Sequence, residues 1–295
     1  MKLTQLQKSK SHRALLFGPP KSGKTKLAGE LSKEFNLIWF DLEKGVDTLL
    51  QLPVEQQERI EVIQLPDTRS FPIAIETMLK VIKGSKYEIC EEHGKIGCAL
   101  CKKDSKAFVS VELNALGLDT IVVVDSLTQL TNSAISHITK SQPEDYKLNY
   151  DDWGNLGKLM DTFLSHVQQA PFNVVCISHE TEVEMEDGKQ KLVPTSGTRN
   201  FSRNTAKYFD EVVYCEVKNK KHVAASSTTY NGNILTGSRT GTVLENILEA
   251  SLIPIFKGEI NTGSSPNSPN GNTPATKALT NLSALQKLKV NQGIK

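Results

Sequence analysis

The stretch Ala14-Leu-Leu-Phe-Gly18-Pro-Pro-Lys-Ser-Gly23-Lys24-Thr25 decides the fold of this chain. It runs from a short apolar strand into the pattern G-x-x-x-x-G-K-T and then into a segment with apolar residues at helical spacing. A glycine-rich loop in this position can surround phosphate with backbone N–H groups, and the following helix points its positive end at the anion. We therefore predict a P-loop that binds a nucleoside triphosphate.

Each residue of this loop has an expected role. Lys24 is predicted to reach the β- and γ-phosphates, and the Thr25 hydroxyl is predicted to bind Mg²⁺. The other loop residues are expected to surround the phosphates with their backbone: Gly18, Pro19, Pro20, Lys21, Ser22 and Gly23. The alternative is a chance glycine-rich turn, which the strand before it and the helix after it disfavour.

A second strand supplies the partner of the P-loop. Thr120-Ile-Val-Val-Val-Asp125-Ser126 is a continuous β-branched run, typical of a strand buried on both faces of a parallel sheet. An aspartate at the carboxyl end of such a strand lies where ligands bind, so Asp125 is expected to hold Mg²⁺ opposite Thr25. An alternative role for Asp125 or Ser126 is to cap the helix that starts at Leu127.

The bulk composition limits the class of protein. A chain of 295 residues with 38% hydrophobic content can bury one sizeable core. The formal net charge of +2 is no global signature of nucleic-acid binding, so any such surface must be local. No segment reaches the length of a membrane span, and residues 1–13 do not resemble a signal peptide. Five cysteines without an export signal favour a reduced, cytoplasmic protein.

Strand and helix patterns alternate along the chain and predict an α/β fold with a mainly parallel sheet flanked by helices. The expected strands are 14–17, 37–41, 60–64, 120–125, 173–178 and 211–217, and the expected helices are 25–35, 71–83, 127–138, 153–169 and 202–208. Turn dipeptides predict a C-terminal β-hairpin at Asn231-Gly232, between 223–230 and 233–239, and another hairpin at Asp187-Gly188.

The last part of the chain differs in composition. From about Asn261 it is rich in Gly, Ser, Asn, Pro and Thr, and it contains lysines but no acidic residue. Such a segment buries too little apolar area to offset its chain entropy. We expect a core over residues 1–257 and a disordered basic tail over 258–295. The leucine repeat from Ala278 to Val290 indicates either a segment that folds on a partner or a solvated tail with weak helicity.

A cysteine–histidine cluster interrupts the core pattern. Cys90-Glu-Glu-His93 is followed, after four residues, by Cys98-Ala-Leu-Cys101. The two short spacings bring paired ligands together on tight turns and predict a structural Cys₃His site for Zn²⁺. The site would order an insert over about 84–108 that is too small for a core of its own. The alternatives are a redox pair at Cys98 and Cys101, or unliganded surface cysteines.

Two further strands end in candidate catalytic side chains. Ile38-Trp-Phe-Asp41-Leu-Glu43 places a carboxylate beside the P-loop, where it can orient or deprotonate the attacking water. Val174-Val-Cys-Ile-Ser178-His179 places a polar side chain where it can contact the γ-phosphate and report its loss. Acidic residues are common at strand ends, and a cap of a helix or loop is an equal alternative for His179.

The order of these motifs resembles the RecA/RadA recombinase core over roughly residues 12–250, and most closely the short, phage-encoded RecA-like ATPases of single-strand annealing. The resemblance rests on the P-loop, Asp41-Leu-Glu43, Ile-Val-Val-Val-Asp125-Ser-Leu, and Val-Val-Cys-Ile-Ser-His179 before a glycine-containing loop. It implies that Glu43 is the catalytic glutamate and that His179 stands where bacterial recombinases carry a glutamine. It also implies DNA-binding loops at 131–152 and 181–205. The large terminal DNA-binding domains of some members have no counterpart in this sequence, and the cysteine–histidine insert is not part of the common core.

The charge pattern of the second loop favours contact with single-stranded DNA. Cations can neutralise phosphates while an aromatic ring stacks on a base. The candidate DNA-binding residues are Lys189, Lys191, Arg199, Phe201, Arg203 and Lys207. A solvated charged face is the alternative, because acidic residues precede this run. Arg239 is a candidate cation for a nucleotide site in its own or a neighbouring subunit, or an ordinary exposed arginine at a strand end.

Together these motifs predict a DNA-stimulated, Mg²⁺-dependent ATPase that binds single-stranded DNA and promotes annealing or recombination. The expected cofactors are ATP, Mg²⁺ and structural Zn²⁺. The expected partners are single-stranded DNA, further copies of the chain in a ring or filament, and a single-strand-binding protein at the C-terminal tail. Two alternatives stay open: a hexameric helicase or translocase motor, and an NTP-dependent regulatory scaffold without nucleic acid.

Overall fold

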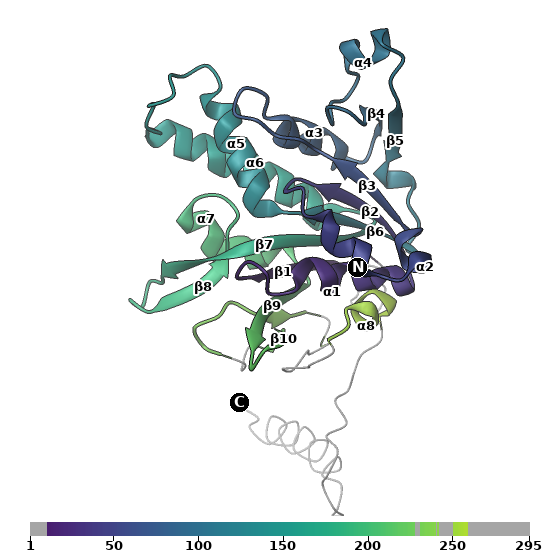
Figure 1. Ribbon diagram of the computed structural model, residues 1–295. Coiled ribbons are helices and arrows are strands. Elements are labelled where there is room, and N and C mark those ends of the chain that lie inside the picture. The colour runs from purple at the N-terminus through teal and green to yellow at the C-terminus, as the bar shows by residue number, and fades with distance from the viewer. Residues whose placement is uncertain (1–10, 228–230, 240, 242–249, 259–295) are drawn as a thin grey trace, which may run out of the picture. The chain divides into compact units, whose positions relative to one another are not determined.

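The computed structural model describes residues 11–227, 231–239, 241 and 250–258. Its centre is a mainly parallel sheet in the strand order β10-β9-β1-β7-β6-β2-β3, with helices on both faces (Figure 1). The parallel strands are β1 (Arg13–Gly18), β2 (Asn36–Asp41), β3 (Ile60–Gln64), β6 (Thr120–Asp125), β7 (Asn173–Glu184) and β9 (Glu211–Lys218). The predicted α/β fold is therefore confirmed for the described residues.

Antiparallel strands extend the sheet at its margins. β10 (Lys221–Ala225) and β11 (Gly237–Ser238) pair with β9, and β8 (Gln190–Pro194) pairs with the end of β7. The β7–β8 hairpin spans Asp187-Gly188, as predicted.

The C-terminal hairpin is placed differently from the prediction. β9 turns into β10 at Asn219 and Lys220, which both have the positive φ that a type I′ turn requires. The segment after Asn231-Gly232 pairs instead with β8, because the Leu192 N–H donates to the Asn233 carbonyl at 2.8 Å. Residues 228–230 of the predicted hairpin lie outside the described residues.

The two faces of the sheet carry separate apolar cores, since side chains of a strand point alternately to opposite faces. In β1, Leu15 and Phe17 belong to one core, and Ala14 and Leu16 to the other. The first core includes α3 (Ile73–Val81), α5 (Leu127–Thr139) and α6 (Tyr150–Gln169). The second includes α1 (Lys24–Gly29), the 3₁₀ turns Glu30–Lys33 and Val46–Gln51, and α8 (Ile253–Lys257).

Shorter elements complete the described chain: α2 (Val54–Gln57), α7 (Arg199–Asn204), and 3₁₀ turns at Leu113–Ala115 and Thr205–Tyr208. The insert contains β4 (Lys86–Cys90), α4 (Ala99–Lys103) and β5 (Phe108–Glu112), and its two strands form a separate sheet. Over the ranges given above, no helix has the length and apolar character needed to cross a membrane. The tail predicted for 258–295 lies outside the described residues except for Gly258.

Candidate functional site

The P-loop connects the carboxyl end of β1 to α1. Gly18 has a φ of 149°, and a Cβ at this position would lie 2.0 Å from the carbonyl oxygen of Cys215 in β9. Only glycine allows this close approach of two backbones. Gly23, the residue before α1, has a φ of 91°, which also favours glycine. The loop thus has the bare, tightly turned backbone that a phosphate-binding loop requires.

The Lys24 ammonium is folded over this loop. Its Nζ donates to the carbonyl oxygens of Gly18 and Pro19 at 2.9 and 2.7 Å, and only 6% of the residue is exposed. Burial lowers the pKa of Lys24, while nearby negative groups that include Asp125 and Glu43 act in the opposite direction. A cation held by loop carbonyls among acidic side chains fits the charge of a triphosphate with its metal.

The two predicted Mg²⁺ ligands lie next to each other. Thr25 Oγ1 donates to Asp125 Oδ2 at 3.1 Å, although 100 residues separate them in sequence. Ser126, rather than Asp125, caps α5, because its Oγ accepts the backbone N–H of Gln129 at 3.3 Å. The capping role is therefore taken by Ser126, and the Asp125 carboxylate faces the P-loop.

The buried position of Asp125 has a consequence for stability. Burial, together with the charge of Glu43, raises the pKa of Asp125 from 3.8 to about 7. The folded protein therefore binds more protons than the unfolded chain between these two values, and this group's contribution to stability falls as the pH rises through that window.

We expect Asp125→Asn, in protein free of metal and nucleotide, to lose less stability than the wild type between about pH 5 and about pH 8. Urea unfolding of both proteins at the two pH values measures this difference. Asp145→Asn, in the exposed connection between α5 and α6, is the matched control. Its stability should depend on pH as that of the wild type does. An identical pH dependence in Asp125→Asn and the wild type would contradict the assignment.

Glu43 lies just past the end of β2, beside His179 of β7. Its Oε1 is 3.5 Å from His179 Nε2 and accepts a hydrogen bond from Ser126 Oγ. Burial pushes the pKa of Glu43 upward, but contacts with His179 and Ser126, together with the charge of Lys24, outweigh burial and bring the pKa below its usual value. Glu43 is therefore ionised near neutral pH, the state in which a carboxylate can accept a proton.

Two supporting contacts were not predicted from the sequence. Asp41 accepts the backbone N–H groups of Glu43 and Gly45, both at 3.2 Å, and so fixes the turn that carries Glu43. Thr128 Oγ1 accepts the backbone N–H of His179 at 2.8 Å. An aspartate before a turn is a recognisable local signal. The Thr128 contact joins residues 51 positions apart and leaves no local pattern.

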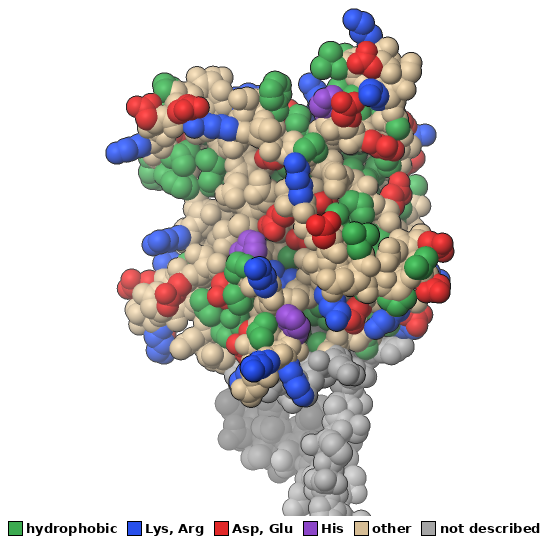
Figure 2. Space-filling model, in the orientation of Figure 1, with side chains coloured by type: hydrophobic (Ala, Val, Ile, Leu, Met, Phe, Trp, Pro, Cys, Tyr) green, Lys and Arg blue, Asp and Glu red, His purple; other side chains and the backbone are tan. Residues whose placement is uncertain are grey.

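The P-loop edge of the sheet forms a mixed polar surface. In Figure 2, acidic, basic and histidine side chains lie side by side near the centre of the face, around the ends of β1 and β7. This edge brings together the Lys24, Thr25 and Asp125 side chains with Glu43 and His179. In the sequence these residues belong to separate strands and loops.

Arg239 does not belong to this edge. Its backbone N–H donates to the Asp210 carbonyl, and its guanidinium donates to the Lys207 carbonyl, both at 2.8 Å. Asp210 immediately precedes β9, whereas the P-loop lies at the other end of the strands, because β1 and β9 are parallel. The predicted role of Arg239 in its own subunit's nucleotide site is wrong. A role in a neighbouring subunit stays a prediction.

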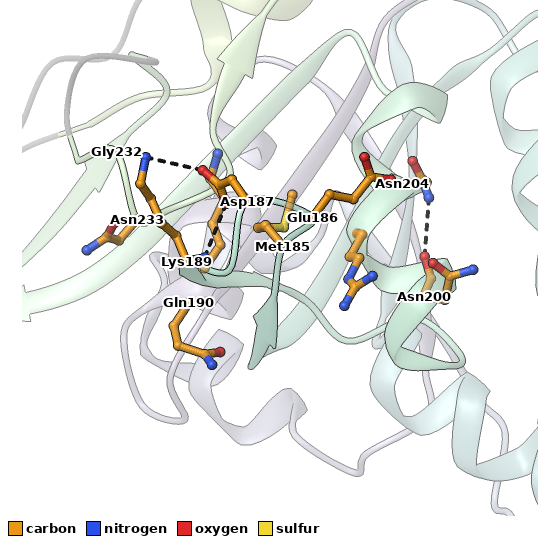
Figure 3. Close-up of a pocket in the computed structure, with 11 residues that line it drawn as sticks. Met185, Glu186, Asp187, Lys189, Gln190, Asn200, Asn204, Gly232 and Asn233 are labelled. Atoms are coloured by element: carbon orange, nitrogen blue, oxygen red, sulfur yellow. Dashed lines mark hydrogen bonds and ion pairs between the residues drawn. The ribbon is translucent and has the colours of Figure 1, made fainter.

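The predicted DNA-binding residues are divided between two hollows beside α7. Lys189, Lys191 and Arg203 line a hollow of about 390 Å³ between the β7–β8 hairpin and α7 (Figure 3). Phe201 and Lys207 line a hollow of about 420 Å³ between α6 and α7. The two hollows share Asn200 and Asn204, and Arg199 is exposed at the start of α7.

Two of these residues already contact neighbouring side chains, which makes them less available to DNA. Lys189 Nζ lies 3.2 Å from Asp187 Oδ2, so part of its charge is already neutralised, as Figure 3 shows at the hairpin tip. Phe201 packs against the core and stacks on Tyr208, with ring centroids 6.1 Å apart. Lys191, Arg199, Arg203 and Lys207 therefore stay the candidates for contact with phosphates.

The cysteine–histidine cluster is compact. The four ligand atoms of Cys90, His93, Cys98 and Cys101 lie within 4.8 Å of one another, and His93 Nδ1 is 3.1 Å from Cys101 Sγ. All three cysteines are buried, so the alternative of surface cysteines is wrong. The cluster could hold a tetrahedral zinc ion, since sulfur and nitrogen ligands about 2.3 and 2.0 Å from the metal lie at such mutual distances.

We expect the purified protein to contain about one zinc per chain. Cys101→Ser should lower the zinc content well below that of the wild type and lower the unfolding temperature, because the three buried cysteines pack with one another and with Phe108 around the ligand cluster. Metal analysis and thermal unfolding measure both effects. Cys176→Ala, in β7 and outside the cluster, should retain the zinc. Wild-type protein with reduced thiols, purified without chelator and free of zinc, would contradict this assignment.

Comparison with known proteins places the chain in a family. Residues 10–243 match the family described as AAA domain. No curated protein matches the sequence. The matched region contains the P-loop, Glu43, the cysteine–histidine insert and strand β6, which ends in Asp125. Because the match covers most of the chain, this protein belongs to the AAA domain family and carries a P-loop, nucleotide-binding ATPase domain.

Proposed function

We propose that this protein is a Mg²⁺-dependent, RecA-like ATPase that binds single-stranded DNA and promotes annealing or recombination. Lys24 binds the β- and γ-phosphates, and Thr25 and Asp125 are the residues that would hold the metal. When bound, Mg²⁺ supplies positive charge that stabilises the transferring phosphoryl group. Glu43 orients the attacking water and accepts its proton, and His179 holds the Glu43 carboxylate in place.

The observation that carries the proposal is a short series of contacts from Glu43 to α7. The His179 side chain is 3.5 Å from Glu43, and the His179 carbonyl accepts the backbone N–H of Thr195 at 2.8 Å. Thr195 begins the connection from β8 to α7, which carries Arg199 and Arg203. A shift of His179 on loss of the γ-phosphate therefore has a direct route to the cationic helix.

The remaining partners are also proposals. A ring or filament of this chain would bring a neighbour's charged groups, with Arg239 as the candidate, to the open side of the catalytic edge. A single-strand-binding protein is the proposed partner of the C-terminal tail. Size-exclusion chromatography with and without ATP tests the first of these proposals.

The main test is ATP turnover measured with and without single-stranded DNA. We expect DNA to stimulate the wild type and to stimulate the double variant Lys191→Ala, Arg199→Ala much less, with the basal rate unchanged. The affinity for DNA should also become less dependent on salt, because the log–log slope changes by about one for each phosphate contact removed. Lys80→Ala, an exposed lysine on α3, is the matched control.

Equal turnover with and without DNA, together with no retention of DNA at low salt, would contradict the proposal. Unwinding of a forked duplex would favour a translocase motor, because an annealing protein is not expected to separate strands.

A further inference from the structure

A groove adjoins the P-loop on the side away from the catalytic carboxylates. It has a volume of about 960 Å³. Ser22 and Gly23 of the P-loop form one end of it. α1 and the 3₁₀ turn after it form one wall, the β9–β10 hairpin forms another, and Ala250 and Ser251 also line the groove. The groove is therefore continuous with the predicted phosphate site.

The order of strands fixes the direction in which a triphosphate must lie. β7, β6 and β2, with His179, Asp125 and Glu43 at their ends, are all on one side of β1. β9 and β10 are on the other side. The γ-phosphate has to face Glu43 for water to attack it in line. The rest of the nucleotide must then leave the P-loop over β9 and β10, where the groove lies.

His222 of β10 stands at the junction of the P-loop and this groove. A Cβ built on Gly23 would lie 2.9 Å from His222 Nδ1, so the imidazole packs directly over the bare Cα of that glycine. His222 is an exposed residue that lines the groove, and Leu27, Val223 and Ala224 also line it and add apolar surface. A flat ring beside apolar side chains suits one face of a nucleobase.

Cations lie along the same groove. Lys26, in the first turn of α1, and Lys221, next to His222, both line it. Lys33 also lines it, but Glu30 lies 3.4 Å from its Nζ and offsets its charge. The groove thus combines apolar walls, which suit a nucleobase, with the cations Lys26 and Lys221, which suit the α-phosphate.

We propose that this groove binds the nucleoside half of ATP and that the His222 ring contacts it. The inference rests on the proposed ATPase function, and it adds a contact that controls affinity for the base and sugar rather than for the phosphates. Inorganic tripolyphosphate, which has the phosphates but no nucleoside, separates the two contributions.

The test is calorimetric titration of Mg-ATP and of Mg-tripolyphosphate into the wild type and His222→Ala. We expect His222→Ala to weaken ATP binding between about fivefold and a hundredfold, the range for loss of one stacked base, and to leave tripolyphosphate binding unchanged. His222→Phe, which keeps a flat ring, should recover most of the ATP affinity. His166→Ala is the matched control, because His166 lies on α6, which belongs to the core on the opposite face of the sheet from α1.

An unchanged ATP affinity in His222→Ala would overturn the inference. So would an equal loss of ATP and tripolyphosphate, because the effect would then lie in the P-loop. If the wild type binds neither compound, the proposed ATPase function fails instead, so the two failures are distinguishable.

Discussion

Lys24→Ala is expected to weaken ATP binding by about a hundredfold or more and to abolish ATP turnover. The lysine is the cation of the P-loop, and its Nζ lies on the carbonyl oxygens of Gly18 and Pro19, at the mouth of the loop. Hydrogen bonds to charged groups contribute about 1.5–3 kcal/mol each, so loss of two phosphate contacts weakens binding by about a hundredfold or more. Calorimetry with Mg-ATP and a phosphate-release assay measure the two effects.

The control for this prediction separates binding from folding. Lys24→Ala removes a buried charge as well as the partner of two carbonyl groups, so thermal unfolding of the variant must accompany the titration. Lys80→Ala removes an exposed lysine in the last turn of α3 and should bind and hydrolyse ATP as the wild type does. A folded Lys24→Ala protein with wild-type affinity for ATP would contradict the assignment of the P-loop.

Glu43→Gln is expected to lower turnover by about 10²–10⁴-fold, the usual effect of losing a positioned general base. Glutamine keeps the size of the side chain and can still accept the hydrogen bond from Ser126, but it cannot take a proton. Affinity for ATP should therefore change little. Single-turnover hydrolysis and calorimetry on the same preparation measure the two quantities.

Glu61→Gln, on the exposed side of β3, is the matched control and should leave turnover unchanged. Asp41→Asn gives a further comparison, because Asp41 acts by holding the turn that carries Glu43. Asp41→Asn should lower turnover less than Glu43→Gln does. Full turnover in Glu43→Gln would show that another group activates the water.

The pattern of single segments was sufficient to predict most of the fold. Apolar, often β-branched runs predicted each parallel strand, because a strand buried on both faces of a sheet needs a continuous apolar sequence. The helical patterns between these runs predicted that the strands are parallel. The G-x-x-x-x-G-K-T spacing predicted the loop at the end of β1, and the close spacing of Cys90, His93, Cys98 and Cys101 predicted the compact cluster. These features depend on residues near one another in the chain, whose geometry follows from local backbone periodicity.

The sequence by itself therefore determined the α/β fold, the P-loop and the cysteine–histidine cluster. Only the tertiary structure decided that Ser126 caps α5 while Asp125 meets Thr25, that Asp41 and Thr128 position Glu43 and His179, and that Arg239 lies at the opposite edge. It also decided that β10 places His222 over Gly23. These contacts join strands that are distant in sequence, and their partners depend on the order and register of strands in the sheet, which no local pattern encodes.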